Sequence, residues 1–281
     1  MTKLPINSDL VGFTTDTVKY SWNERDTMLY ALGIGCRPPE DLDFIYEGRG
    51  PKVVPTFAVI PGLQAMGSAM MSIDINLATL LHGEQSATTH RPLPPKADVT
   101  VDGEIIAVWD KGKAAVIEFA GRGSDADGPL FTVGASLFIM GGGGWGGERG
   151  PSGSARSSSP PEREPDLVID RDTRPELAAI YRLSGDMNPM HIDPDFAIAA
   201  GFPGTFNHGL CTFGTIGHSV LSAWCDGDVN QFESIEGRFV DQVWPGDTIT
   251  TRIWDEGDHA IIEGRTQTGS VVVSNGRATK K

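Results

Sequence analysis

The feature that most constrains this 281-residue chain is an internal repeat. Residues 109–118 and 254–263 are identical at six of ten positions at an offset of 145 residues. Each segment places an Asp-x-Gly turn between two apolar stretches, a pattern that predicts a β-hairpin. A second match, Gly-Leu-x-x-x-Gly, begins at Gly62 and again at Gly209, and each copy opens an apolar stretch of helical length. Because the order is the same in both halves, the sequence predicts a duplicated unit.

Each unit reads as a long apolar helix followed by alternating strands. We expect the long helices at about 62–81 and 209–224, and a short one at 195–200. A buried helix wrapped by a curved antiparallel sheet is the economical architecture, which is an α+β class. The expected strands are at 99–109, 114–121, 131–140, 233–243, 248–254, 260–268 and 270–274.

A segment of unusual composition separates the halves. Residues 141–165 contain eight Gly, four Pro and five Ser. Such a stretch buries little apolar surface, so we expect a flexible linker between domains at 1–140 and 166–281. Its Gly run lacks the Lys-Ser/Thr ending of a phosphate-binding loop.

Composition excludes several classes of partner. Lys and Arg number 23 against 37 Asp and Glu, a net charge of −14 that disfavours nucleic acid and anionic membranes. The longest uncharged run, 53–73, is interrupted by Pro and Gly and therefore does not predict a spanning helix. Three cysteines without metal-type spacing indicate buried free thiols, and no secretory signal is recognised. We expect a cytoplasmic protein.

One segment, 181–194, concentrates reactive side chains. Asp186, Asn188 and His191 lie within six residues of turn-forming sequence. A carboxylate beside an imidazole suits general acid–base chemistry on a water molecule. A metal site using the more distant His208 is a weaker alternative, because no second His or Cys lies nearby. An Asx-turn would explain Asp186 and Asn188 without any function, although it leaves the histidine unexplained.

The second long helix adds an electrostatic element. Gly209 stands at its expected start, where free backbone N–H groups and the positive end of the helix dipole favour a developing oxyanion. Glycine also lets a carbonyl group approach its backbone closely. This feature alone is common among helices.

These residues resemble a known family. The segments YRLSGDMNPMHID (181–193) and FNHGLCTFG (206–214) are similar to the MaoC-like (R)-specific enoyl-CoA hydratases, hydratase 2. The first half resembles the two-domain version of that family, found in the peroxisomal multifunctional enzyme. The matching stretches there are YALGIG (30–35), FIYEG (44–48), PTFAVIP (55–61) and LHGEQ (81–85). The resemblance implies a double hotdog fold.

The resemblance also implies roles for individual residues. Asp186 and His191 would hold the water, and Asn188 would bond within the same site. The Gly209 N–H would bind the thioester carbonyl of an acyl-CoA substrate, with no metal or redox cofactor. The residues implied to contact the CoA thioester are His82, Gly83, Lys111 and Phe239. One departure from the family is the less aliphatic segment 202–208.

The implied reaction is reversible hydration of trans-2-enoyl-CoA to (3R)-3-hydroxyacyl-CoA. No Asp-x-Asn-Pro-x-His occurs before the linker, which predicts one active site per chain. We expect the non-catalytic first half to accommodate the acyl group, and a homodimer is a possible assembly. Two alternatives stay open: an acyl-CoA thioesterase, and a non-catalytic acyl-CoA-binding subunit that needs a partner.

Overall fold

The computed structural model describes residues 3–76, 80–151 and 158–281. The first half contains, in chain order, β1 (Val18–Trp22), α1 (Glu24–Gly33), α2 (Leu42–Ile45), α3 (Val59–Ser72), β2 (Leu80–Thr89), β3 (Ala97–Asp110), β4 (Ala114–Asp125) and β5 (Gly128–Met140). The second half contains β6 (Leu167–Asp172), α4 (Leu177–Tyr181), α5 (Pro194–Ala199), α6 (Gly209–Trp224), β7 (Phe232–Phe239), β8 (Thr248–Asp255), β9 (Ala260–Thr266) and β10 (Val271–Lys280). Short 3-10 helices include η6 (Arg182–Ser184) and η7 (Pro189–His191).

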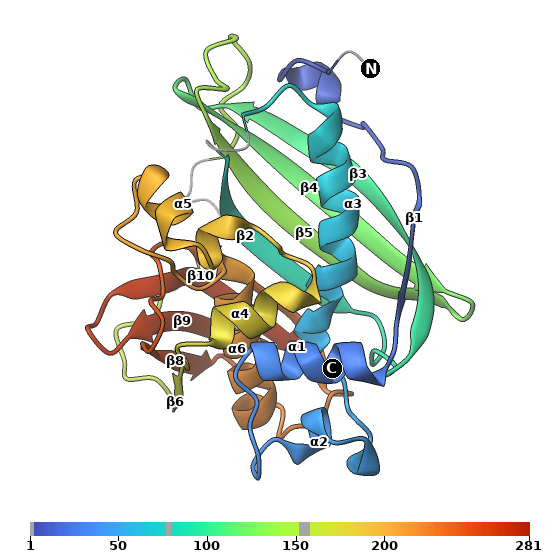
Figure 1. The fold of residues 1–281 in the computed structure, drawn as a ribbon, viewed down its shortest axis with the longest axis vertical. Helices are drawn as coiled ribbons and strands as arrows, with labels where there is room; N and C mark the ends of the chain where they lie inside the picture. Colours follow the sequence, from blue (N-terminus) through green and yellow to red (C-terminus); the bar gives the residue numbers. More distant parts are fainter. Residues whose placement is uncertain (1–2, 77–79, 152–157) are drawn as a thin grey trace.

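One antiparallel sheet runs through both halves (Figure 1). In the described part of the chain it has ten strands, in the order β1-β3-β4-β5-β2-β7-β10-β9-β8-β6. The order within the first half is the mirror of that in the second, and β2 pairs with β7 at the seam. The two predicted hairpins are β3–β4 and β8–β9, which occupy equivalent places. The predicted duplication and the double hotdog, α+β architecture are therefore confirmed.

The long helices α3 and α6 each pack on the sheet of their own half. The predicted helix at 209–224 agrees with α6, but the predicted end of the first helix at residue 81 was wrong. α3 ends at Ser72, and the chain enters β2 at Leu80. Strands β1, β2 and β6 were not predicted. The inward face of β2 carries buried Gln85 and Thr89, so its sequence lacks the apolar alternation that marks a half-buried strand.

The Gly-rich segment is attached to the first half along 141–151, which differs from the expected free linker. The carboxylate of Asp110, at the end of β3, accepts hydrogen bonds from the backbone N–H groups of Gly112, Gly144 and Gly146 at 2.8 Å and of Gly147 at 3.3 Å. These bonds lower the pKa of Asp110 to about 2. A run of glycines can wrap around one anion because its N–H groups point inward without side-chain hindrance. Residues 152–157 of the expected linker lie outside the described residues.

Helix α6 is bound to the first half along several turns. The Cys211 thiol donates to the carbonyl oxygen of Gly33 (3.2 Å), and the Thr215 hydroxyl donates to that of Ile34 (2.9 Å). Gly33 approaches the second half so closely that a Cβ atom there would lie 2.9 Å from the Cα of Tyr181. The first half thus fixes the position of the helix that begins at Gly209.

All three cysteines are free and buried, as predicted. Within the described residues, the helices are too short or too polar to cross a membrane.

Candidate active site

The loop between α4 and α5 is shaped by its own polar side chains. Asp186 Oδ1 accepts a hydrogen bond from the N–H of Asn188 (3.2 Å), and Asn188 Oδ1 accepts from that of Met190 (3.1 Å). Asp193 caps α5, as predicted, by accepting from the N–H of Asp195 at 3.0 Å. These Asx-turn and capping contacts hold the loop in one conformation. The Asx-turn therefore exists, and it positions Asp186 for a further role.

The loop brings Asp186 close to two histidines. One carboxylate oxygen of Asp186 and one ring nitrogen each of His191 and His208 lie within 4.8 Å of one another. The rings of His191 and His208 form a tilted stack, with centroids 3.9 Å apart and an angle of 35° between their planes. The predicted pair of Asp186 and His191 is thus joined by His208, which the sequence offered only as a distant metal ligand.

A hydrogen bond to a backbone carbonyl oxygen defines the tautomer of His191. His191 Nδ1 lies 2.8 Å from the carbonyl oxygen of Phe206, so Nδ1 carries the hydrogen and Nε2 is left as a free base. Burial lowers the pKa of His191, opposed by the Phe206 carbonyl and by the Asp186 charge. A neutral imidazole with a bare Nε2 beside a carboxylate can accept a proton from water near neutral pH.

The first amides of α6 lie at the same place. His208 is the N-cap of α6 and makes no side-chain capping bond, and Gly209 follows as the first helical residue. The first N–H groups of a helix lack intrahelical acceptors, so they are available to a ligand oxygen. The aromatic ring of Phe239, at the end of β7, would lie 3.5 Å from a Cβ atom at Gly209. Because residue 209 is glycine, no side chain occupies the space between its backbone and the ring of Phe239.

The first half contributes His82 to this region. Its ring meets that of Phe239 edge to face, with centroids 5.3 Å apart, and the Asp186 charge acts on it. Burial lowers the pKa of His82 to about 4, so it is neutral at physiological pH. Its Nε2 is buried and has no hydrogen-bond partner among the described residues. Three predicted residues from distant parts of the sequence, His82, Phe239 and Gly209, therefore lie together.

The two other residues implied to contact CoA lie differently. Gly83 stands at an irregularity in the pairing of β2 with β5, where a Cβ atom would come 2.7 Å from the ring of Phe138. Lys111 lies in the β3–β4 turn and donates to the carbonyl oxygens of Arg149 and, at 3.2 Å, Pro151. Within the described residues, Lys111 makes its side-chain hydrogen bonds to this Gly-rich segment and not to Asp186 or His191.

Two groups of side chains with metal-ligand atoms close together occur in the described chain, and each offers three protein ligands. At Asp186, each of the two imidazoles has one nitrogen on a backbone carbonyl oxygen, which leaves one free nitrogen on each ring. The other group joins Cys36, Asp41 and His218. There the sulfur lies 3.7 and 3.8 Å from the two ring nitrogens, which places it over the ring face, away from either lone pair.

The first half carries no equivalent site at the corresponding place. The loop after α1 contains Cys36 and Asp41, both buried and directed at His218 of α6. Tyr30 of α1 and Tyr181 of α4 are in ring contact, with centroids 5.9 Å apart and planes tilted by 54°. Only the second half therefore provides an acid, an amide and an imidazole on this loop within the described chain.

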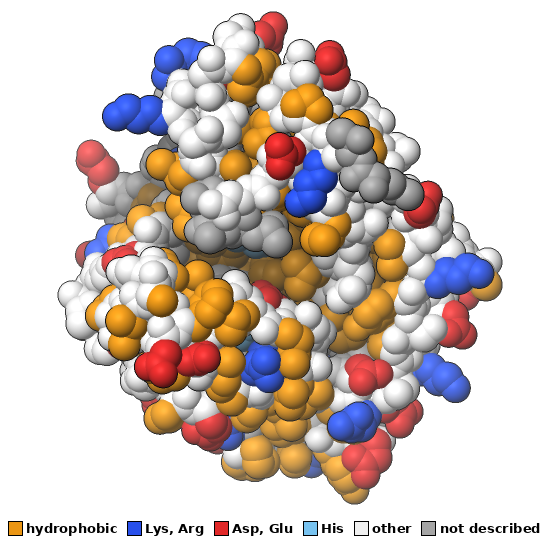
Figure 2. Space-filling model, turned by 45° about the horizontal axis from the view of Figure 1, so that its top comes forward, with side chains coloured by type: hydrophobic (Ala, Val, Ile, Leu, Met, Phe, Trp, Pro, Cys, Tyr) orange, Lys and Arg blue, Asp and Glu red, His pale blue; other side chains and the backbone are white. Residues whose placement is uncertain are grey.

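Apolar side chains surround the loop. Leu183, Met187 and Ile192 on the loop, and Phe196 and Ile198 on α5, are all exposed. Figure 2 shows a hollowed face with hydrophobic side chains in and around the hollow. A second apolar space lies between α3 and the sheet of the first half and extends to Leu210, next to Gly209; its other lining residues include Leu63, Met66, Gln85, Phe119 and Val133.

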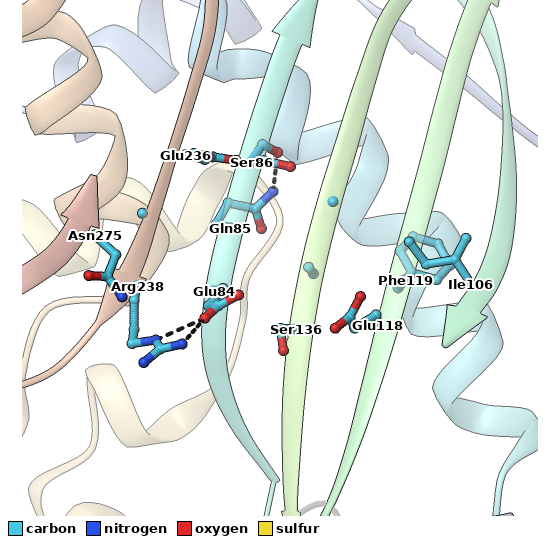
Figure 3. Close-up of a pocket in the computed structure, with 13 residues that line it drawn as sticks. Glu84, Gln85, Ser86, Ile106, Glu118, Phe119, Ser136, Glu236, Arg238 and Asn275 are labelled. Atoms are coloured by element: carbon cyan, nitrogen blue, oxygen red, sulfur yellow. Dashed lines mark hydrogen bonds and ion pairs between the residues drawn. The ribbon is translucent and has the colours of Figure 1, made fainter. Parts of the chain in front are cut away.

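A wider depression of about 180 Å³ lies on the other side of the sheet, across the seam (Figure 3). There Glu84 of β2 faces Arg238 of β7, whose Nε donates to Glu84 Oε1 at 2.8 Å. Ser86, Glu118 and Glu236 also line it. None of the predicted site residues lies in this depression, which crosses the strands and is lined by both polar and apolar residues.

Comparison with known proteins gives the family. Residues 20–141 match the MFE-2 hydratase 2 N-terminal domain, and residues 156–280 match the MaoC like domain. The chain is 36% identical to an enoyl-CoA hydratase of Mycobacterium tuberculosis, covering 96% of this chain and 98% of that protein. It is 37% identical to the mouse peroxisomal multifunctional enzyme type 2, of whose length it spans 37%. The crystal structure of a MaoC-like dehydratase from Phytophthora capsici superposes with a TM-score of 0.87 at 32% identity, covering 98% of both chains. This chain therefore belongs to the two-domain MaoC-like hydratase 2 family.

Proposed function

We propose that this protein hydrates trans-2-enoyl-CoA to (3R)-3-hydroxyacyl-CoA and catalyses the reverse dehydration. The observation that carries the proposal is a neutral His191 with a bare Nε2, whose ring has one nitrogen within 4.8 Å of an Asp186 carboxylate oxygen, next to the residue that precedes Gly209 at the start of α6. Its similarity to an enoyl-CoA hydratase over nearly its whole length supports the same reaction.

The geometry supports a sequence of proton movements. The Gly209 N–H binds the thioester carbonyl oxygen and stabilises negative charge there. Asp186 and His191 hold the water, and His191 Nε2 takes one of its protons as the oxygen bonds to C3. The electron pair of the C2–C3 double bond moves to form an enolate on the thioester. His191 then returns the proton to C2 on the same face, which regenerates the neutral imidazole. No step needs a resident metal or redox cofactor.

The substrate would extend across both halves. The apolar space under α3 has a volume of only about 10 Å³ and adjoins Leu210, so an acyl chain whose carbonyl meets Gly209 would continue into the first half by displacing the side chains that line this space. His82, Gly83 and Phe239 would border the thioester, and Asn188 would assist from the loop. Lys111 would supply positive charge for the CoA phosphates, with which an ammonium group forms strong charge-assisted bonds. A homodimer in the cytoplasm completes the proposal.

The decisive experiment follows the absorbance of the conjugated enoyl thioester. Purified wild-type protein is mixed with a short and a long trans-2-enoyl-CoA, and a (3R)-specific dehydrogenase identifies the product. Asp186→Asn removes the carboxylate with little change in shape, and we expect it to lower kcat by about 10²–10⁴-fold. Asp195→Asn, an exposed residue on α5, is the matched control and should retain wild-type activity.

The alternatives give different results in the same assay. Release of free CoA thiol without the 3-hydroxy product would indicate a thioesterase. Tight binding of enoyl-CoA by folded protein with no turnover would indicate a non-catalytic subunit. Wild-type activity in Asp186→Asn would refute the assigned mechanism.

A further inference from the structure

His208 is the buried titratable group at the site that the proposed mechanism does not use. It is 1% exposed and lies directly before Gly209. One face of its ring stacks on His191, and the ring of Tyr181 approaches it with a centroid distance of 5.0 Å and a tilt of 49°. Its environment is therefore set by the two loops that carry the catalytic pair and the oxyanion amide.

The hydrogen bond made by His208 defines its tautomer. Nε2 lies 3.1 Å from the backbone carbonyl oxygen of Asp186, which can only accept, so Nε2 carries the hydrogen. Nδ1 is then bare, and it is buried without a partner among the described residues. His191 has the opposite arrangement, with the hydrogen on Nδ1 and the bare nitrogen at Nε2. His191 thus donates its only N–H to a carbonyl oxygen on the loop that carries His208, and His208 donates its only N–H to a carbonyl oxygen on the loop that carries His191.

The charged groups that face His208 are Asp186, His191 and Arg182, and Tyr181 is the remaining titratable neighbour. Burial and, to a smaller extent, the adjacent His191 lower the pKa of His208 to about 4, although the Asp186 charge opposes both. His208 therefore stays neutral when His191 gains a proton. A positive charge on His208 would repel the imidazolium of His191, because the two ring centroids are only 3.9 Å apart.

We propose that His208 is a positioning residue: its Nε2–H tether to Asp186 and its stack on His191 fix the carboxylate and the catalytic base relative to each other and to Gly209. The inference rests on the proposed hydratase function for its kinetic consequences. It does not require His208 to touch the substrate. Displacement of a reacting group by about 1 Å can cost about 10²-fold in rate, so loss of either contact has a measurable effect.

Two substitutions of His208 separate the hydrogen bond of its Nε2–H to Asp186 from the stacking of its ring on His191. His208→Gln places an amide N–H where Nε2–H lies and removes the aromatic ring. His208→Phe keeps a stacked ring and removes the donor. His218→Gln is the matched control, because His218 is a second buried histidine on the same helix whose Nε2 also meets an acidic residue, Asp41, at 3.3 Å.

We expect His208→Phe to lower kcat by about 10²-fold with KM nearly unchanged, and His208→Gln to recover at least about tenfold of that loss. His218→Gln should lower the melting temperature without a matching loss of kcat. If His208→Phe keeps the wild-type kcat, or loses activity only in proportion to its melting temperature, the positioning role is overturned. The hydratase function is tested separately by the assay of wild-type protein and Asp186→Asn, so failure of the positioning role can be told apart from failure of the proposed function.

A spectroscopic arm does not depend on turnover. Long-range ¹H–¹⁵N correlation spectra of protein labelled at histidine report which ring nitrogen carries hydrogen, and the two variants of His208 assign its signals. The inference requires Nε2–H at His208 and Nδ1–H at His191 at pH 7. The same tautomer at both positions, or a charged His208, would overturn it even if no substrate is turned over.

Discussion

Oδ1 of Asp41 in the first half lies 3.3 Å from Nε2 of His218 in α6 of the second half, and both residues are buried. The Asp41 carboxylate also accepts from the N–H of Arg37 at 2.9 Å and lies 3.6 Å from Arg171. We expect Asp41→Ala to lower the free energy of unfolding by about 3–5 kcal/mol, because it leaves buried donors and a partly buried guanidinium without their partner. Urea unfolding measures this loss.

The control for that prediction is Asp43→Ala. Asp43 forms an ion pair with Lys52 at 3.0 Å, but both side chains are more than 40% exposed. Exposed pairs contribute about 0–1 kcal/mol. An equal loss of unfolding free energy in Asp41→Ala and Asp43→Ala would show that the contacts of Asp41 with His218 and Arg171 do not stabilise the contact between the halves.

Acidification should destabilise the protein between pH 6.5 and 4. Burial lowers the pKa of His82 and His208 to about 4 and that of His218 to about 3, from an ordinary 6.5. In this window the unfolded chain binds protons that the folded chain does not, so the free energy of unfolding falls as pH falls. Urea unfolding at pH 7, 6 and 5 tests this. His218→Phe should weaken the dependence, whereas a constant value across this range would contradict the neutral, buried state of these histidines.

The carboxylate of Asp110 should control the order of the Gly-rich segment. Asp110→Ala removes the acceptor shared by Gly112, Gly144, Gly146 and Gly147. We expect the amides of residues 144–147 to exchange with deuterium much faster in this variant. Asp102→Ala, also on β3 but bonded to the Thr17 hydroxyl, is the control. Unchanged exchange in Asp110→Ala would mean that other contacts order the segment.

The space under α3 should set the preference for acyl length. Met66 lines this small space of about 10 Å³, and a bulkier Met66→Trp side chain would close it and prevent it from widening around an acyl chain. We expect kcat/KM for a long-chain enoyl-CoA to fall far more than for a four-carbon one. Met71→Trp is the control on the same helix, since Met71 is 65% exposed. An equal effect on both chain lengths would place the acyl group elsewhere.

The sequence by itself determined the features that depend on neighbouring residues. The duplication was visible because both hairpins keep their Trp-Asp-x-Gly pattern, and the turn that carries Asp186, Asn188 and His191 is closed by its own side chains. Gly209 was recognised because an apolar stretch of helical period begins there. Local periodicity and turn chemistry are encoded over a few residues, so these features need no knowledge of the fold.

Only the tertiary structure decided what lies against that loop. His208 stacks on His191 because two loops meet, and His82 reaches Phe239 because β2 pairs with β7 in a particular register. No local pattern indicated β2, whose inward face is partly polar, or the N–H groups that converge on Asp110. Such contacts join residues far apart in the chain. They depend on strand register and on how closely two backbones can approach, and no local pattern encodes either.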